Sequence, residues 1–221
     1  MAFEFVNRGE VIKKQAYNPF IPSYEYIRDP EPYVFDGKVY VFGSHDKFNG
    51  TTYCMNNYLG WSASVNDLGD WKYEGVIYDK VQDPLSKQKG NHYLYAPDVA
   101  RGVDGRYYLY YSLSGIHILS VAVCDTSAGK YEFYGHVHDK SGHLLGFAKG
   151  EYIQFDPAVL VDDDERVYLY SGYNPPQRFV SFILDRKRAP LSYSGRRGQR
   201  GESQSIYIEF QERCNCRIQI F

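Results

Sequence analysis

The chain has 221 residues, of which 43% are hydrophobic and 24% are charged, and its formal net charge at pH 7 is -2. This composition supports at least one sizeable folded core and excludes a chain that is disordered over most of its length. The near-neutral charge gives no reason to expect nucleic acid or an anionic membrane as a partner. Aromatic residues make up 17% of the chain and include 23 tyrosines, which favours β-structure.

In chain order, a hairpin pattern occurs three times. Each copy has an apolar strand, a tight acidic turn, and a strand in which tyrosine alternates with aliphatic residues. The copies occupy residues 29–44, 97–112 and 156–171, with turns at Asp36-Gly37, Asp104-Gly105 and Asp164-Glu165. After the first two copies, residues 61–78 and 119–138 share a second pattern of strand, loop and aromatic strand.

One repeating unit therefore contains four antiparallel strands, and the acidic turns recur after 68 and then 60 residues. Four-stranded units at this period are typical of β-propeller blades. A β-sandwich also has many short strands but does not repeat the same four-strand unit. No segment has a long helical period, so the chain is predicted to be all-β.

The number of units is too small for a closed ring, which needs at least four blades. We predict an incomplete propeller of about two and a half to three blades within residues 1–177: blade I at about 17–80, blade II at about 90–140, and the start of blade III at about 150–177. Residues 178–221 lack the acidic-turn pattern and hold nine Lys/Arg against four Asp/Glu. This tail is either a native basic extension or the product of a frameshift or truncation, and the interrupted third blade favours the second explanation.

The segments IRDPEPYVFDGKVYVFGSHD, YAPDV and FDPAVLVDDDERVYLY, in this order and spacing, resemble glycoside hydrolase family 43. The resemblance covers roughly residues 17–177 and implies a five-bladed β-propeller that cleaves arabinose- and xylose-containing glycans by an inverting mechanism. It implies that Asp29 is the general base and that Asp156 tunes the pKa of a general acid. The family's acid is a glutamate from a later blade, and no segment here matches it, so we expect a chain impaired by truncation.

The chemistry of inversion agrees with these roles. A carboxylate must activate water while a carboxylic acid protonates the leaving oxygen, and the two groups lie about 6.5–9.5 Å apart. Such a pair must come from different blades. Asp29 and Asp156 each begin the inner strand of a unit, which favours a functional role over ordinary Asp-Pro turn chemistry.

Four further residues are candidates for substrate binding. Asp98 begins the second inner strand and is expected to bind sugar hydroxyls. Tyr95 stands where the family usually has tryptophan and is expected to stack on a sugar face. His45 and Asp46 end the first hairpin and are placed at the pocket rim. Turn capping by Asp98, packing by Tyr95 and a structural role for His45 remain the alternatives.

We predict no bound cofactor. The run Asp162-Asp163-Asp164 lacks the spaced ligands of a calcium loop and is predicted to be a solvated turn. The family resemblance allows a metal ion such as calcium in the central channel, but no residue of this chain can be assigned to it. The expected partner is an oligosaccharide, and the sequence gives no oligomeric state.

Localisation rests on weaker features. The spacing of Cys54, Cys124, Cys214 and Cys216 matches no zinc site, which favours unpaired thiols in a reducing compartment. The N-terminus lacks a basic region followed by an apolar run, and no stretch approaches about 18 apolar residues. We therefore expect a cytoplasmic protein without a membrane partner.

Three functions remain open at this point. The first is a glycosidase related to family 43, of the α-L-arabinofuranosidase or β-xylosidase type. The second is a non-catalytic carbohydrate-binding propeller that keeps the aspartates and aromatic walls. The third is an interaction propeller whose aspartates are only turn residues.

Overall fold

The computed structural model describes residues 2–7, 10–15, 19–88, 92–139, 141–163, 165–172, 180–184 and 208–209. Its helical segments are short: η1 (Lys80–Gln82) and α1 (Pro84–Gln88). Neither these nor any other described helix is long and apolar enough to cross a membrane. The strands are β1 (Ala2–Asn7), β2 (Glu10–Gln15), β3 (Ile27–Phe35), β4 (Lys38–His45), β5 (Tyr58–Ser64), β6 (Asp67–Tyr78), β7 (Leu94–Arg101), β8 (Tyr107–Leu113), β9 (Leu119–Cys124), β10 (Glu132–His136), β11 (Ala158–Val161), β12 (Val167–Ser171), β13 (Val180–Leu184) and β14 (Ile208–Glu209).

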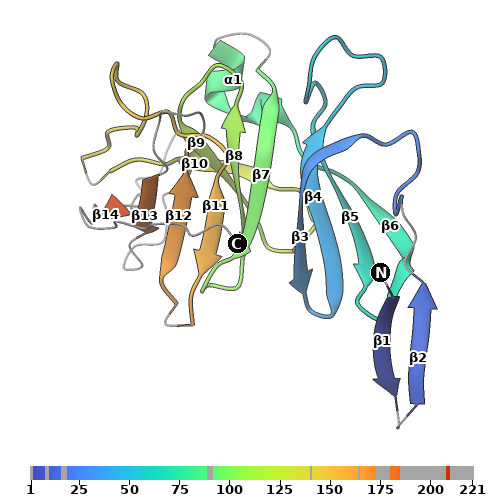
Figure 1. Ribbon diagram of the computed structural model, residues 1–221. Coiled ribbons are helices and arrows are strands. Elements are labelled where there is room, and N and C mark those ends of the chain that lie inside the picture. The colour runs from blue at the N-terminus through green and yellow to red at the C-terminus, as the bar shows by residue number, and fades with distance from the viewer. Residues whose placement is uncertain are drawn as a thin grey trace, which may run out of the picture.

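Twelve of these strands form three antiparallel four-stranded sheets in simple chain order, β3-β4-β5-β6, β7-β8-β9-β10 and β11-β12-β13-β14. Figure 1 shows them side by side, with the first strands of the sheets, β3, β7 and β11, towards one another. β7 contacts β3 and β4 on one side and β11 on the other. The predicted all-β fold, an incomplete propeller of four-stranded blades, is confirmed. The sequence did not predict the separate hairpin of β1 and β2.

The first predicted hairpin turn shows why these segments fold as they do. β3 and β4 pair up to Phe35 and Lys38, so only Asp36 and Gly37 connect them. Both have positive φ, 49° and 76°. A two-residue turn with this geometry matches the right-handed twist of the flanking strands, and Asp-Gly adopts it at low cost.

The core consists of two layers of side chains, one between each pair of neighbouring sheets. β8 is buried on both faces because alternate side chains point to opposite sides of a sheet. Tyr107, Leu109 and Tyr111 pack against the first sheet, whereas Tyr108 and Tyr110 pack towards the third. The tyrosine-rich pattern thus lets one strand serve both layers.

A buried polar network joins the first two sheets at the end that carries α1. Asp83 is fully buried and accepts a hydrogen bond from the hydroxyl of Tyr111, which also bonds the hydroxyl of Tyr78. Burial acts to raise the pKa of Asp83, but hydrogen bonding and the charge of His136 outweigh it and lower the pKa. The ionised carboxylate of Asp83 therefore stabilises the contact between the first two sheets.

Residues 178–221, predicted as an aberrant tail, lie mostly outside the described residues. Within them, β13 pairs with β12 along its whole length, and β14 pairs with the end of β13. The edge of β12 that the sequence left unpaired is therefore covered by a strand. The origin of the tail stays a prediction.

Candidate active site

A strained backbone position recurs near the start of the inner strand of all three sheets. Asp29, Ala96 and Asp156 each precede a proline and have φ of 47°, 34° and 46°. Positive φ is uncommon for residues other than glycine, although Asp and Asn adopt it more readily than most. Such conformations persist only where the surrounding structure holds them in place, and they occur most often at functional sites.

The strand pairing fixes which residues correspond between the sheets. β3 has a bulge between Arg28 and Glu31, and β7 has one between Tyr95 and Asp98. Asp98 therefore corresponds to Glu31, two residues beyond the strained position. Ala96, and not Asp98, stands at the place that Asp29 and Asp156 occupy in the other two sheets.

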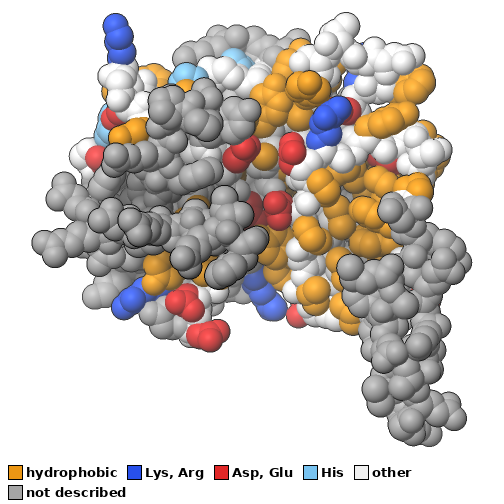
Figure 2. All heavy atoms as spheres, in the orientation of Figure 1, with side chains coloured by type: hydrophobic (Ala, Val, Ile, Leu, Met, Phe, Trp, Pro, Cys, Tyr) orange, Lys and Arg blue, Asp and Glu red, His pale blue; other side chains and the backbone are white. Residues whose placement is uncertain are grey.

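Asp29 and Asp156 come from different sheets yet interact electrostatically. Burial raises the pKa of Asp156 to about 6, and the negative charge of Asp29 adds to the rise. Both residues are exposed to solvent. Figure 2 shows acidic side chains gathered near the middle of the face that carries the inner strands. The two predicted aspartates therefore lie close enough for the charge of one to influence the other, and their catalytic roles stay a prediction.

This electrostatic coupling gives a direct test. In the Asp29→Asn variant the pKa of Asp156 is expected to fall below about 6 but to stay above its ordinary value, because burial is the larger cause. Carboxyl ¹³C chemical shifts, followed through a pH titration of both proteins, measure the change. An Asp156 pKa that is identical in the two proteins would show that the carboxylates do not share a pocket.

Asp98 differs from its prediction as a sugar ligand. Asp98 is only 2% exposed, and its Oδ2 accepts a hydrogen bond of 2.5 Å from the backbone N–H of Val159. The hydroxyl of Tyr33 lies beside the same carboxylate and partly offsets the rise in the pKa of Asp98 that burial causes. Asp98 on β7 therefore connects to β3 and β11, and this burial does not fit a direct contact with a sugar.

Glu31, which takes the corresponding place on β3, belongs to the same acidic group. Its pKa is raised first by burial and then by the negative charges of Asp98 and Asp29. Four carboxylates, those of Asp29, Glu31, Asp98 and Asp156, thus influence one another across three inner strands. No role was predicted for Glu31 from the sequence.

Two hydrogen bonds from the first sheet hold the upper end of β7. The buried hydroxyl of Ser44 accepts from the N–H of Ala96 at 2.8 Å, and the hydroxyl of Tyr58 donates to the carbonyl of Tyr95 at 2.8 Å. The ring of Tyr95 packs against Phe155, with centroids 5.7 Å apart. Tyr95 is thereby placed next to the residue that precedes Asp156, and its stacking on a sugar stays a prediction.

The two predicted rim residues, His45 and Asp46, lie at the same end of the first sheet. Asp46 lines a surface depression and pairs with Arg28. The ring of His45 lies 3.6 Å from the carboxylate of Glu25. The carboxylate of Asp46 is already engaged, which favours a supporting role over direct hydrogen bonding to a sugar.

The described residues offer no metal centre. Within the described ranges, no three His, Cys, Asp or Glu side chains group together as ligands would. Asp162 opens the turn between β11 and β12, where its N–H bonds the carbonyl of Arg166 and its carbonyl accepts from Glu165.

Comparison with known proteins places this geometry in a family. Residues 16–187 match the family model of glycosyl hydrolases family 43. The chain belongs to this family. The matched range includes Asp29, Asp156 and all strands from β3 to β13.

Among curated proteins, this family 43 chain is 58% identical over 164 residues to a xylosidase/arabinosidase of Thermoclostridium stercorarium, a match that covers 74% of this chain and 34% of that protein. It is 37% identical over 160 residues to xylosidase/arabinosidase 43A of Humicola insolens, covering 66% and 43%. A solved β-xylosidase/α-arabinofuranosidase from a compost microbial metagenome, in complex with xylotriose, matches with a TM-score of 0.51 and 34% identity over 68% of this chain and 44% of that one. The chain thus spans less than half of the length of each of these relatives, and only about a third of the first.

Proposed function

We propose that this chain is part of a glycosidase that hydrolyses xylose- and arabinose-containing oligosaccharides with inversion, in which Asp29 is the general base. The observation that carries this proposal is the matching place of Asp29 and Asp156, which have the same positive φ near the start of the inner strands of different sheets, together with the effect of Asp29 on the pKa of Asp156. The names of the relatives in the same family support the substrate class.

In the proposed reaction, Asp29 accepts a proton from water while that water attacks the anomeric carbon of the sugar. The bond to the leaving oxygen breaks, and this oxygen takes a proton from a general acid. Asp29 suits the base role because its exposed carboxylate can reach a water molecule. Asp156, with its pKa raised to about 6, supplies a nearby carboxyl group whose charge keeps the acid protonated near neutral pH.

We assign the general acid to no described residue, and propose that it lies in a part of the enzyme that this chain lacks. Two described glutamates are already engaged elsewhere. Glu74 on β6 bonds Ser62 and Lys72, and Glu151 accepts from the N–H of Ala148. Since general acid catalysis contributes about 10²–10⁴-fold, this chain alone is expected to act slowly on glycosides with poor leaving groups.

Two β-D-xylosides with different leaving groups test this proposal. We expect the chain to hydrolyse 2,4-dinitrophenyl β-D-xyloside slowly and methyl β-D-xyloside far more slowly, because the dinitrophenolate leaves without a proton. Proton NMR of the first product is expected to show the inverted α-anomer. Sugar binding without hydrolysis of either compound would favour a non-catalytic carbohydrate-binding propeller, and a retained β-anomer would contradict the role of Asp29 as a base.

A further inference from the structure

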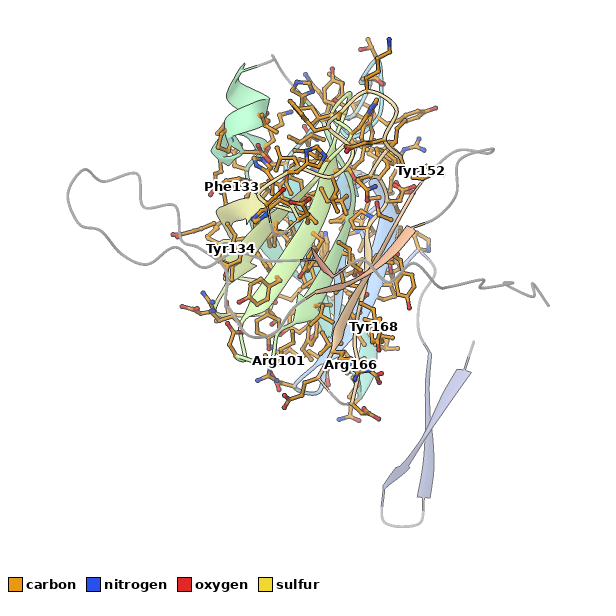
Figure 3. All side chains as sticks on the ribbon, turned by 90° about the vertical axis from the view of Figure 1, so that its left-hand side faces the viewer. Arg101, Phe133, Tyr134, Tyr152, Arg166 and Tyr168 are labelled. Atoms are coloured by element: carbon orange, nitrogen blue, oxygen red, sulfur yellow. The ribbon has the colours of Figure 1, made fainter. Side chains whose placement is uncertain are left out.

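Asp46 lies at the point where a long loop leaves the first sheet. Residues 46–57 form this loop and connect β4 to β5. Figure 1 shows the loop standing above the first sheet, and Figure 3 shows Tyr152, four residues before Asp156, at the same upper end. The loop therefore lies at the end of the molecule that carries the candidate active site.

Asp46 holds this end of the sheet through its backbone and through both carboxylate oxygens. Its N–H donates to the carbonyl of Tyr26 at 2.9 Å, and its own carbonyl accepts from the side chain of Asn56 at 2.9 Å. One carboxylate oxygen accepts from Nε of Arg28, and the other accepts from the N–H of Cys54 at 2.7 Å. The carboxylate thus joins β3, which carries Arg28, to the part of the loop that leads into β5.

The candidate base, Asp29, is next to both groups that this carboxylate holds. Arg28 precedes it in the chain, at the bulge of β3. Cys54 lies close enough in space for the charge of Asp29 to act on its thiol: burial raises the pKa of Cys54 to about 11, and the negative charges of Asp46 and Asp29 add to the rise. Asp46 is therefore placed to control the position of Asp29 through its neighbour in sequence and through its neighbour in space.

The backbone around Asp29 has to be held in place, because its φ is 47°. Close packing against β4 supplies part of this support. A Cβ atom at Gly43 would lie 2.9 Å from the carbonyl oxygen of Arg28 and would also meet the side chain of Ile27. The side chain of Arg28 is 53% exposed and is held by its ion pair with Asp46, whose side chain is only 14% exposed. β4 thus supports the backbone of Arg28, and Asp46 holds its side chain.

The second sheet shows that a blade does not need an aspartate at this place. Ser114 corresponds to Asp46, because its N–H donates to the carbonyl of Tyr93 as that of Asp46 donates to Tyr26. The hydroxyl of Ser114 accepts from the N–H of Tyr93 at 2.8 Å, so its contact stays within the local backbone. The strained position of this sheet is Ala96. The aspartate therefore accompanies the strained aspartate of the first sheet and not the alanine of the second, and the corresponding place in the third sheet lies outside the described residues.

We propose that Asp46 is a positioning residue for the general base: by holding Arg28 and Cys54, it keeps the carboxylate of Asp29 directed at the attacking water. This inference rests on the proposed function and adds the group that orients the base. A base must lie within hydrogen-bond reach of the proton that it accepts, so a small displacement of Asp29 lowers the rate. Direct binding of a sugar by Asp46, as predicted from the sequence, is the alternative that the test has to separate.

The test replaces Asp46 in two ways. Asp46→Ala removes both carboxylate contacts, whereas Asp46→Asn keeps an oxygen that can accept from the N–H of Cys54. We expect kcat on 2,4-dinitrophenyl β-D-xyloside to fall by about 10²-fold in Asp46→Ala, as for a misplacement of about 1 Å, and to fall less in Asp46→Asn. The affinity for xylose, measured by isothermal titration calorimetry, should stay the same in both variants. Asp70→Ala, which removes an exposed aspartate on β6 of the same sheet, is the matched control and should leave kcat unchanged.

The titration of Asp156 gives a readout that a purely structural role of Asp46 would not change. The pKa of Asp156 is raised to about 6 by burial and by the charge of Asp29. We expect Asp29 to move away from Asp156 in Asp46→Ala, so the pKa of Asp156 should fall towards its value in Asp29→Asn. Carboxyl ¹³C chemical shifts measure this change. Adding Asp46→Ala to Asp29→Asn should then cause no further fall.

The outcomes separate this inference from the proposed function. An unchanged Asp156 pKa or an unchanged kcat in a folded Asp46→Ala variant would overturn the positioning role and leave the proposed function intact. Weaker xylose binding at an unchanged kcat would make Asp46 a sugar ligand instead. Asp46→Asn carries the same comparison if urea unfolding shows that the alanine variant does not fold. If the unaltered chain hydrolyses neither xyloside, the proposed function fails, and the titration of Asp156 still decides whether Asp46 places Asp29.

Discussion

Replacing Asp29 with asparagine is expected to lower kcat on 2,4-dinitrophenyl β-D-xyloside by about 10²–10⁴-fold. The amide cannot accept a proton from the attacking water, whereas departure of the dinitrophenolate needs no acid. Asparagine is the suitable replacement because it tolerates positive φ, and Asp29 has φ of 47°. Steady-state rates at saturating substrate measure the loss, and urea unfolding checks that the fold is unchanged.

Asp36→Asn provides a control matched in both chemistry and backbone. Asp36 has φ of 49° and lies in the exposed turn between β3 and β4, at the opposite end of the same strand. Its replacement should leave kcat within about twofold, since surface substitutions change little. Added azide should restore turnover in Asp29→Asn, because azide attacks the anomeric carbon without losing a proton. Equal rates for the Asp29→Asn and unaltered proteins would remove Asp29 from the reaction.

The repeat explains why the fold could be predicted. The Asp36-Gly37 turn between two alternating runs specifies a hairpin locally, and its recurrence specifies equivalent sheets. The alignment within the site was less certain, because three short segments could be matched on their aspartates or on their prolines. Matching on Pro30, Pro97 and Pro157 gives the correct correspondence, since each proline follows the strained residue. That choice would have placed Ala96, not Asp98, beside the two catalytic candidates.

The contacts of the loop of residues 46–57 could not be deduced from the repeat, because this segment does not repeat. One signal was nevertheless present in the sequence, the extra length between the two strands. The salt bridge of Arg28 with Asp46 joins residues far apart in sequence and depends on the path of the loop. Non-local contacts of this kind follow from the folded chain and not from a local pattern.

The second large effect expected is on stability, and it concerns Asp98. Asp98→Ala should lower the free energy of unfolding by about 1–3 kcal/mol, the cost of leaving a buried hydrogen-bond donor without its acceptor. The N–H of Val159 would lose its acceptor inside the core, and Tyr33 would lose its polar neighbour. Asp98→Asn keeps an oxygen that can accept from Val159 and should cost less. Asp125→Ala, at an exposed bend, should change the free energy by no more than about 0.5 kcal/mol.

Loss of Asp98 is also expected to affect the active site by shifting the position of Asp156, and not by removing a contact with the sugar. Because Asp98 on β7 accepts from the N–H of Val159 on β11, three residues after Asp156, we expect it to fix the place of Asp156 relative to Asp29. In Asp98→Asn, kcat should therefore fall while the affinity for xylose changes little, and the pKa of Asp156 should shift from about 6 as its distance from Asp29 changes. A variant that is destabilised but keeps the Asp156 titration and kcat would show that Asp98 supports the core alone. A variant that loses xylose binding without losing stability would return Asp98 to the role of a sugar ligand.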